Sequence, residues 1–157
     1  MAVFKKQLSP EQALQKLRHY CGYQERCHSD VRDKLYSLGV RKAEHDGIIA
    51  SLIGEGYLNE ERFAIAFAGG KFRVKQWGRI KIKHALKQKE VSEYCVKKAL
   101  KYIDEEQYRG VLLKLAQEKY ASLNDEQYLV RKKKTIDYLA QKGFEPSLIS
   151  ESFGNID

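Results

Sequence analysis

The sequence contains an imperfect internal repeat with a period of about fifty residues, and this repeat constrains the fold more than any other feature. Leu35, Leu86 and Leu139 recur at intervals of 51 and 53 residues. Each leucine is followed five residues later by a second apolar position, and then by two further apolar positions that lie four residues apart. These later positions are Val40, Val91 and Phe144, then Ile48, Val96 and Ile149, and finally Leu52, Leu100 and Phe153. The spacing indicates two helices joined by a tight turn in every copy.

A longer helical pattern precedes each pair of helices, at about residues 10–22, 60–75 and 105–121. We therefore predict an all-α fold of three tandem three-helix repeats, which occupy residues 1–56, 57–103 and 104–157. One such repeat cannot bury both of its faces, so stacked repeats give a continuous core and an elongated, curved molecule. The alternative is a chance coincidence of common apolar residues within a helical bundle.

Residues that favour helix ends mark the boundaries of the predicted helices. Ser9, Pro10 and Gln12 have the spacing of a capping box with proline in the first helical turn. Gly39 and Gly143 each follow an apolar helical pattern, where glycine can take the left-handed conformation that ends a helix. We find no sustained alternation of β-branched residues, so we expect no strands.

Positive charge is concentrated in the middle repeat. The whole chain has 29 Lys and Arg against 21 Asp and Glu, a formal charge of +8. Residues 57–103 carry 12 basic and 4 acidic side chains, whereas the first repeat has a net charge of +2 and the third of −2. From Phe63 to Lys89 there is no acidic residue. This excess favours an acidic or polyanionic partner, although a solvated helix face is the simpler alternative.

We predict that the middle repeat carries the partner-binding surface. Spacing by four residues places Arg79, Lys83 and Lys87 on one exposed stripe of a helix whose core face includes Ile82 and Leu86. The candidate contacts to an acidic or polyanionic partner are Arg62, Lys71, Arg73, Lys75, Trp77, Arg79, Lys81, Lys83 and Lys87.

Two of these candidates also have a purely structural interpretation. Trp77 either stacks on a base or is buried between repeats, as tryptophan often is. Arg62 either contacts the partner or pairs with an acidic residue of a neighbouring repeat. The basic run Arg131–Lys134 is interpreted as a solvated face, because four successive helical residues span about 300° and cannot all face one ligand.

Three segments resemble the RecX family. Residues 56–64, GYLNEERFA, are similar to its G-Y-L-[DN]-[DE]-x-R-F-A signature, with Asn59 where aspartate is commoner. Residues 78–86, GRIKIKHAL, are similar to the family's following G-x-x-x-I-x-x-x-L block. Lys34, Leu35 and Gly39 resemble its first-repeat K-L-x-x-x-G segment, while Cys27 stands where serine is frequent and weakens one helix cap.

The resemblance implies a regulator, mainly an inhibitor, of the RecA recombinase, with a fold of three tandem three-helix repeats. It implies binding in the groove of the RecA–DNA nucleoprotein filament. There, family members limit filament growth and inhibit strand exchange, ATP hydrolysis and coprotease activity, in recombination, DNA repair and the SOS response. Beside the RecA–DNA filament we expect at most weak direct binding of single- or double-stranded DNA. Two other functions stay open from the residues alone: a stand-alone nucleic-acid-binding helical repeat, whose binding to bare DNA would depend steeply on salt, and an inert scaffold.

We expect no enzyme, no cofactor and no metal site. His19, Cys21, Cys27 and His28 lie within ten positions, but their spacing does not match a structural zinc site. The sequence has no phosphate-binding glycine motif, nucleophile elbow or pattern of paired carboxylates.

The sequence also gives expectations about location and assembly. Three cysteines in a chain that is 32% charged suggest free thiols in a reducing cytoplasm. No segment approaches the roughly 20 apolar residues of a membrane span, and the first ten residues lack the apolar run of a secretory leader. We expect a cytoplasmic monomer that does not bind membranes.

Overall fold

The computed structural model describes residues 8–154, and all regular structure in that range is helical. The helices form three consecutive groups of three. The first unit contains α1 (Pro10–Tyr23), α2 (His28–Ser37) and α3 (Lys42–Gly54). The second unit contains α4 (Glu60–Lys75), α5 (Arg79–Gln88) and α6 (Glu93–Lys101). The third unit contains α7 (Glu105–Ser122), α8 (Tyr128–Gln141) and α9 (Pro146–Phe153).

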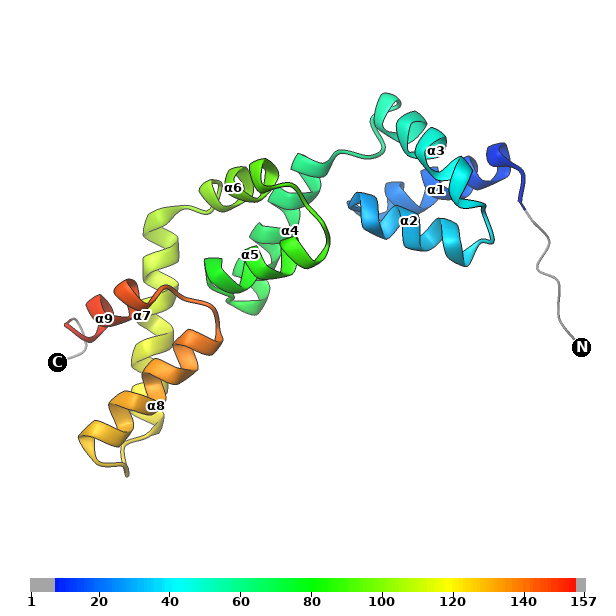
Figure 1. The fold of residues 1–157 in the computed structure, drawn as a ribbon. Helices are drawn as coiled ribbons and strands as arrows, with labels where there is room; N and C mark the ends of the chain where they lie inside the picture. Colours follow the sequence, from blue (N-terminus) through cyan, green and yellow to red (C-terminus); the bar gives the residue numbers. More distant parts are fainter. Residues whose placement is uncertain (1–7, 155–157) are drawn as a thin grey trace, which may run out of the picture.

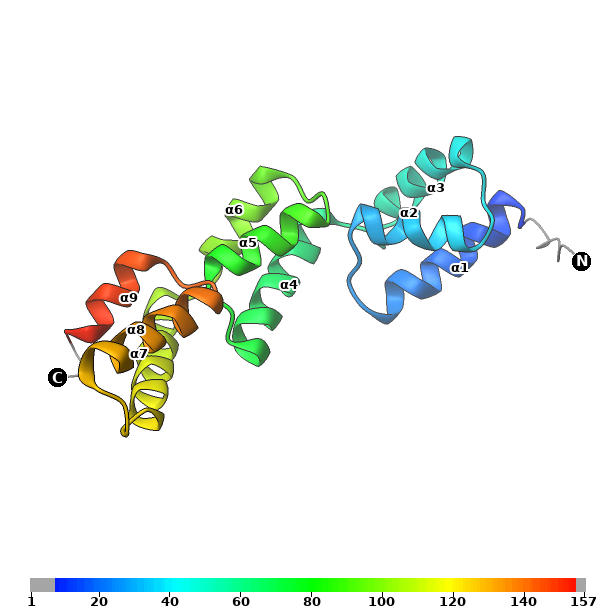
Figure 2. The same ribbon diagram turned by 60° about the horizontal axis from the view of Figure 1, so that its bottom comes forward.

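The predicted all-α fold of three tandem three-helix repeats is therefore confirmed, and no strand occurs in residues 8–154. The units follow one another along an arc, which makes the molecule elongated and curved (Figure 1 and Figure 2). In Figure 1, α2, α5 and α8 lie along the inner side of the arc, and α3, α6 and α9 lie along its outer side. The repeat boundaries at residues 56/57 and 103/104 stay a prediction.

The repeat extends to the hydrogen bonds of the turn between the second and third helix of each unit. In every unit, an apolar residue after the turn donates its amide to the carbonyl of the repeated leucine, at 3.0–3.2 Å. The donor–acceptor pairs are Val40–Leu35, Val91–Leu86 and Phe144–Leu139. The residue before the donor is left-handed each time, with φ of 75° at Gly39, 63° at Glu90 and 98° at Gly143. The two glycine turns are as predicted. Glu90 adopts the left-handed conformation although it is not glycine, which costs about 1 kcal/mol or more.

The buried side chains form two separate apolar clusters. The first lies within the first unit and includes Leu17, Leu35 and Leu52. The second runs continuously through the second and third units, where Leu86 and Leu139 belong to the same cluster. Of the repeat positions identified in the sequence, all are buried except Leu100, which is partly buried against the second cluster. The second and third units thus share one core, whereas the first unit has its own.

The contact between the second and third units, here called the second junction, includes a direct contact between two backbone segments. The amide of Gly78 donates to the carbonyl of Lys142 at 2.8 Å, and the amide of Ile80 donates to the carbonyl of Gly143 at 2.9 Å. A Cβ on Gly78 would overlap the backbone of Gly143, and a Cβ on Gly143 would overlap Lys81. Only glycine allows two backbones to approach this closely.

The contact between the first and second units, here called the first junction, is made by polar side chains. Arg62 Nε lies 2.6 Å from Glu25 Oε1, and Lys89 Nζ lies 3.0 Å from Asp30 Oδ1. The Ser29 hydroxyl donates to the carbonyl of Lys89 at 2.9 Å. The first unit contributes one residue to the second apolar cluster, Cys27, which is the N-cap residue before α2 and whose amide donates to the Asp30 carboxylate.

The start of α1 has the predicted cap. The amide of Gln12 donates to the Ser9 hydroxyl at 3.2 Å, and the amide of Ser9 donates to the Gln12 side chain at 3.0 Å. The expectation about a leader concerns the first ten residues, of which 1–7 lie outside the described part of the chain. Among the helices of residues 8–154, none has the length and apolar character needed to cross a membrane.

Candidate partner-binding surface

The basic segment of the second unit folds as the last turns of α4, a short connection and α5. The Asn59 side chain caps α4 by accepting a hydrogen bond from the amide of Arg62 at 2.9 Å. Arg73 and Lys75 stand in the last turn of α4, where the helix dipole favours cations. The helix ends at Gln76, whose φ of 56° is left-handed and redirects the chain into α5. This turn brings the basic end of α4 next to the start of α5.

Trp77 lies in the connection with an ammonium group from each of these helices near its ring. Lys71 Nζ of α4 is 5.0 Å from the ring centroid, and Lys81 Nζ of α5 is 4.6 Å from it. Both distances are within the range of cation–π attraction. The ring is partly buried against the second apolar cluster. Trp77 is therefore neither fully enclosed between units nor a free stacking platform, and it holds two lysines close together.

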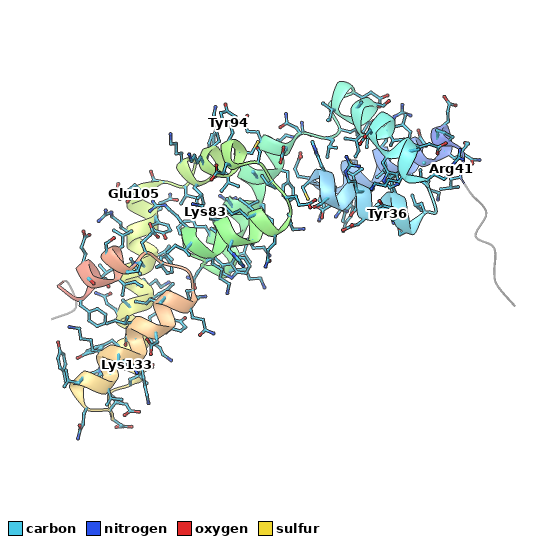
Figure 3. All side chains as sticks on the ribbon, in the orientation of Figure 1. Tyr36, Arg41, Lys83, Tyr94, Glu105 and Lys133 are labelled. Atoms are coloured by element: carbon cyan, nitrogen blue, oxygen red, sulfur yellow. The ribbon has the colours of Figure 1, made fainter. Side chains whose placement is uncertain are left out.

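Lys83 and Lys87 project from α5 one helical turn apart, and both are exposed (Lys83 in Figure 3). Neither forms an ion pair with any residue in the range 8–154. The same is true, within that range, of the candidates Lys71, Arg73, Lys75 and Lys81. The exposed charge of this surface is thus not neutralised by carboxylates of the described chain.

The predicted exposure of Arg79 is wrong, because its guanidinium is committed to the second junction. It pairs with Glu145 at 2.7 Å and with Glu105, and it stacks 3.8 Å from the centroid of the Tyr108 ring. Only 20% of its side chain is exposed. The three partner residues lie 26 to 66 positions away in sequence, so no helical periodicity could have indicated them. The exposed stripe of α5 contains Lys83 and Lys87 without Arg79.

Tyr108 links these groups at the second junction. Its hydroxyl accepts a hydrogen bond from the amide of Arg79 at 3.0 Å and donates one to Glu145. Its ring packs between Phe72 of the second unit and Phe144 of the third, with centroid distances of 5.6 and 5.3 Å. Burial and the bond to Glu145 raise the pKa of Tyr108, so the hydroxyl stays protonated and remains a donor.

Arg62 and Arg73 lie apart from the α5 stripe. Arg62 follows the structural alternative: it pairs with Glu25 across the first junction and donates to the carbonyl of Gly56 at 3.0 Å. The guanidinium of Arg73 packs over Gly69 and lines a groove of about 330 Å³ between α4, α6 and α7. The candidate residues therefore do not form one continuous patch.

The basic run at the start of α8 is dispersed and is a solvated face only in part, because Lys133 and Lys134 are exposed while Arg131 and Lys132 are half-buried. Arg131 stacks on the ring of Tyr120 at 3.7 Å, and Lys134 pairs with Glu126. Lys132 lies 5.6 Å from the ring centroid of Phe153, and Lys133 is exposed on α8 (Figure 3).

The cysteines and histidines of the first unit do not assemble a metal centre in the described residues. Cys21 and Cys27 are buried thiols, and burial raises the pKa of each. Across residues 8–154, no group of three or more His, Cys, Asp or Glu side chains is placed to hold a metal ion.

Family models of known proteins match the second and third units, which contain the basic α5 surface and the second junction. Residues 59–100 match the family model for the second three-helix domain of RecX, and residues 105–152 match the model for the third. Together the two matches cover more than half of the chain. The chain belongs to the RecX family. The predicted resemblance to the RecX family is thus confirmed.

Curated relatives extend the RecX match into the first unit. "Regulatory protein RecX" of Bacillus cytotoxicus is 27% identical over 130 residues, which is 83% of this chain and 48% of the relative. "Regulatory protein RecX" of Clostridium tetani is 31% identical over 116 residues, which is 73% of this chain and 53% of the relative. The chain spans about half the length of these relatives.

Solved RecX structures have the same fold. The crystal structure of RecX from Lactobacillus salivarius gives a TM-score of 0.86 at 22% identity, covering 94% of this chain and 96% of that one. A second crystal structure of regulatory protein RecX gives a TM-score of 0.85 at 22% identity, covering 92% of this chain and 73% of that one. The RecX arrangement of three-helix units is therefore shared along nearly the whole described chain.

Proposed function

We propose that this RecX-family protein regulates the RecA recombinase, mainly as an inhibitor, by binding the RecA–DNA filament. In this proposal it limits filament growth and filament activities in recombination and DNA repair. Family membership and the relatives' designation as regulatory proteins support a regulatory role. The observation that carries the binding mode is the exposed surface of α5 and the end of α4, whose lysines have no ion-pair partner among residues 8–154.

The central contacts in this proposal are Lys83 and Lys87 of α5, and the group formed by Lys71, Trp77 and Lys81 is a second candidate contact. An uncompensated cluster of cations attracts a polyanion or an acidic protein surface, and a filament of protein on DNA offers both. α5 lies on the inner side of the arc, as do α2 and α8 (Figure 1). Contact along this side would let one elongated molecule touch several positions on a filament.

We further propose that the protein acts as a cytoplasmic monomer through binding alone, without catalysis or a cofactor. The polar groups of the second junction are engaged with one another: Arg79, Tyr108 and Glu145 form a closed set of hydrogen bonds. Such a set supports a structural role for these residues.

RecA ATP hydrolysis on single-stranded DNA tests the proposed function. The protein is added in increasing amounts, all well below the concentration of RecA, and the hydrolysis rate is measured at constant salt. We expect a dose-dependent loss of most of the activity, because one regulator bound to a filament affects many RecA subunits. An unchanged rate across the whole range would contradict the proposal.

The second candidate function is nucleic-acid binding without RecA, and it is favoured by Lys71 and Lys81, which lie close together around the Trp77 ring and could contact phosphates. It predicts tight binding to bare DNA, with an affinity that falls steeply as salt rises because counterions are released from the phosphates. If binding at physiological salt is weak on bare DNA and strong on RecA-coated DNA, this candidate fails and the first is supported.

A further inference from the structure

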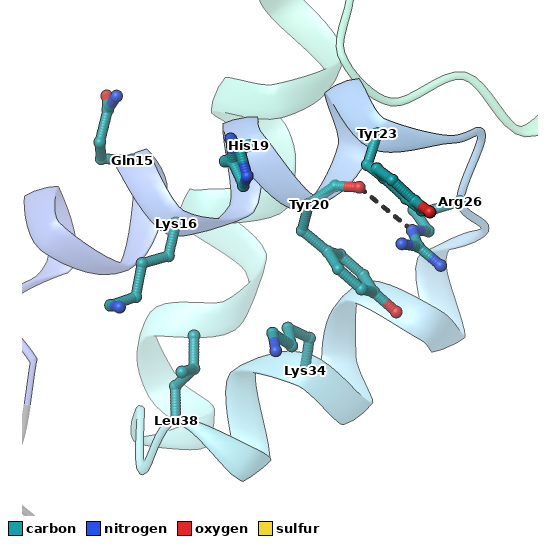
Figure 4. A pocket seen from close by; sticks show the side chains of 8 residues that line it. All are labelled: Gln15, Lys16, His19, Tyr20, Tyr23, Arg26, Lys34 and Leu38. Atoms are coloured by element: carbon teal, nitrogen blue, oxygen red, sulfur yellow. Dashed lines mark hydrogen bonds between the residues drawn. The ribbon is translucent and has the colours of Figure 1, made fainter.

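The first unit has a basic and aromatic hollow that the proposed function does not use. It lies between α1 and α2 and has a volume of about 560 Å³ (Figure 4). Lys16, Arg26 and Lys34 line it together with the rings of Tyr20 and Tyr23. No acidic side chain is among the described residues of its lining. The net charge of the first repeat, +2, does not reveal this concentration of basic residues, because the acidic residues of that unit lie outside the hollow.

Arg26 is held in place at one end of the hollow. Its Nε donates to the carbonyl of Tyr20 at 3.2 Å, and its guanidinium carbon lies 3.7 Å from the centroid of the Tyr20 ring. Its two terminal nitrogens form no hydrogen bond or ion pair with residues 8–154. A guanidinium with a fixed position and free donors binds a phosphate with little loss of conformational freedom.

Tyr23 supplies an open ring beside this cation. It is 80% exposed, and it lies three residues after Tyr20, on the same face of α1. Tyr23 and Arg26 line the same hollow, and Figure 4 shows Lys34 reaching up from α2 and Lys16 further back along α1. Exposed aromatic rings flanked by cations are the elements with which proteins hold unpaired bases and the connecting phosphates.

The third unit provides an internal comparison. Arg131 stacks on Tyr120 at 3.7 Å, and its Nε donates to the Tyr120 carbonyl, as Arg26 does with Tyr20. The Tyr–Arg contact is therefore also a way of closing the turn between the first two helices of a unit. The third unit has Leu123 three residues after its tyrosine, and the register of Leu35 and Leu139 places Tyr138 where the first unit has Lys34. The open ring of Tyr23 and the cation of Lys34 therefore distinguish the first unit.

We propose that the hollow between α1 and α2 binds a nucleotide of single-stranded nucleic acid, with its base stacked on Tyr23 and the adjoining phosphates on Lys16, Arg26 and Lys34. A paired base in a duplex cannot reach the ring, and an acidic peptide has no base to stack. This inference does not depend on RecA, so it is tested without RecA, and its failure leaves the proposed function intact.

The test is binding of a fluorescent oligo(dT) strand of about 15 nucleotides to the full chain, measured by anisotropy. Tyr23→Ala is compared with Tyr94→Ala, which removes an exposed tyrosine from α6 on the outer side of the arc (Figure 3). We expect Tyr23→Ala to weaken binding about 5-fold or more, as loss of one stacking contact does, and Tyr94→Ala to change it less than about 2-fold.

Salt dependence tests the phosphate contacts separately. Lys16→Ala should reduce the slope of log affinity against log salt by about 1, compared with Lys97→Ala, which removes an exposed lysine from α6. Three results would each overturn the proposal: no binding of the strand by the unmodified protein, equal binding by Tyr23→Ala, or the same dependence on Tyr23 for a duplex or a poly-glutamate peptide. Loss of affinity confined to Tyr23→Ala and to the single strand supports it.

Discussion

The two junctions between units are held together by different kinds of contact. At the second junction, backbone meets backbone at Gly78 and Gly143, and the apolar core passes from one unit to the next. At the first junction, the two units are connected by two ion pairs and by one hydrogen bond from a hydroxyl group. Their apolar cores are separate, except that Cys27 of the first unit belongs to the second cluster. Partly exposed ion pairs contribute little, about 0–1 kcal/mol each, whereas a shared core contributes with every buried side chain.

This difference teaches that a tandem repeat need not be held together uniformly. The second and third units form one body, in which Tyr108 of α7 lies between the aromatic rings of Phe72 and Phe144. The first unit is a smaller body attached by polar contacts, and we expect it to reorient at the first junction. The basic α5 surface belongs to the larger body and the basic hollow between α1 and α2 to the smaller one.

The largest effect is expected from Gly78→Ala. Its Cβ would overlap the backbone of Gly143, and no side-chain movement can relieve that contact, so we expect a loss of about 4 kcal/mol or more in the free energy of unfolding of the second and third units. The control is Gly110→Ala in α7, where the added methyl meets open space and should stabilise by about 0.5–1 kcal/mol. Denaturant unfolding measures both. Similar stabilities for the two variants would contradict the account of this junction.

Truncating the repeated leucine in one unit at a time tests whether the two bodies unfold independently. Leu35→Ala and Leu86→Ala each empty a fully buried position and should each cost about 2–5 kcal/mol. Trp77 is the sole tryptophan and lies in the second unit, so its fluorescence reports on the larger body. We expect Leu86→Ala to shift the Trp77 transition and Leu35→Ala to shift only the loss of helix seen by circular dichroism. A Trp77 transition that moves equally in both variants would mean that the whole chain unfolds as one unit.

Arginine removal compares the polar contacts of the two junctions. Arg79→Ala leaves Glu145 and the Tyr108 ring without their partner at a largely buried position, and we expect a loss of about 2 kcal/mol. Arg62→Ala removes a side chain that is 46% exposed, and we expect at most about 1 kcal/mol. Thermal unfolding of both variants provides the measurement. A larger loss for Arg62→Ala would reverse the ranking of the junctions.

The smallest effect is the pH dependence of the first junction. Burial acts to raise the pKa of Asp30, but hydrogen bonds from Cys27 and Lys89 outweigh it, so the pKa is lowered. A lowered carboxyl pKa stabilises the fold fully above the ordinary value of about 4, and this stabilisation is lost as pH falls through the folded value. We expect the stability difference between the unmodified protein and Asp30→Asn, about 1 kcal/mol at pH 6, to shrink below pH 4. A difference that stays constant down to pH 3 would exclude this role.

Periodicity predicted the fold well because burial repeats with the helix. Leu35, Leu86 and Leu139 are fully buried at the same position of successive units, as their spacing indicated. Glu90 was missed as a left-handed turn residue, because glycine is the usual signal and the tertiary structure imposed this conformation on a glutamate. Spacing by four residues placed both Lys83 and Arg79 on an exposed stripe, which was correct for Lys83 and wrong for Arg79.

The candidate surface was predicted less completely for a related reason. A helix period places a side chain on a face but does not show which distant element covers that face. Arg79 is covered by Glu105 and Glu145, and Arg62 is paired with Glu25, all far away in sequence. Lys83 and Lys87 stay exposed because no unit packs on that part of α5 in the described chain.

The most direct test of the central claim reverses the charge of the exposed α5 stripe and measures inhibition of RecA ATP hydrolysis on single-stranded DNA. Lys83→Glu with Lys87→Glu is compared with Lys97→Glu and Lys101→Glu on α6, which has the same spacing, exposure and charge change on the outer side of the arc (Figure 1). Both variants are first checked for unchanged helix content. We predict that the α5 variant needs at least about tenfold more protein for half-inhibition, while the α6 variant inhibits like the unmodified protein. Equal inhibition by the two folded variants would contradict the account.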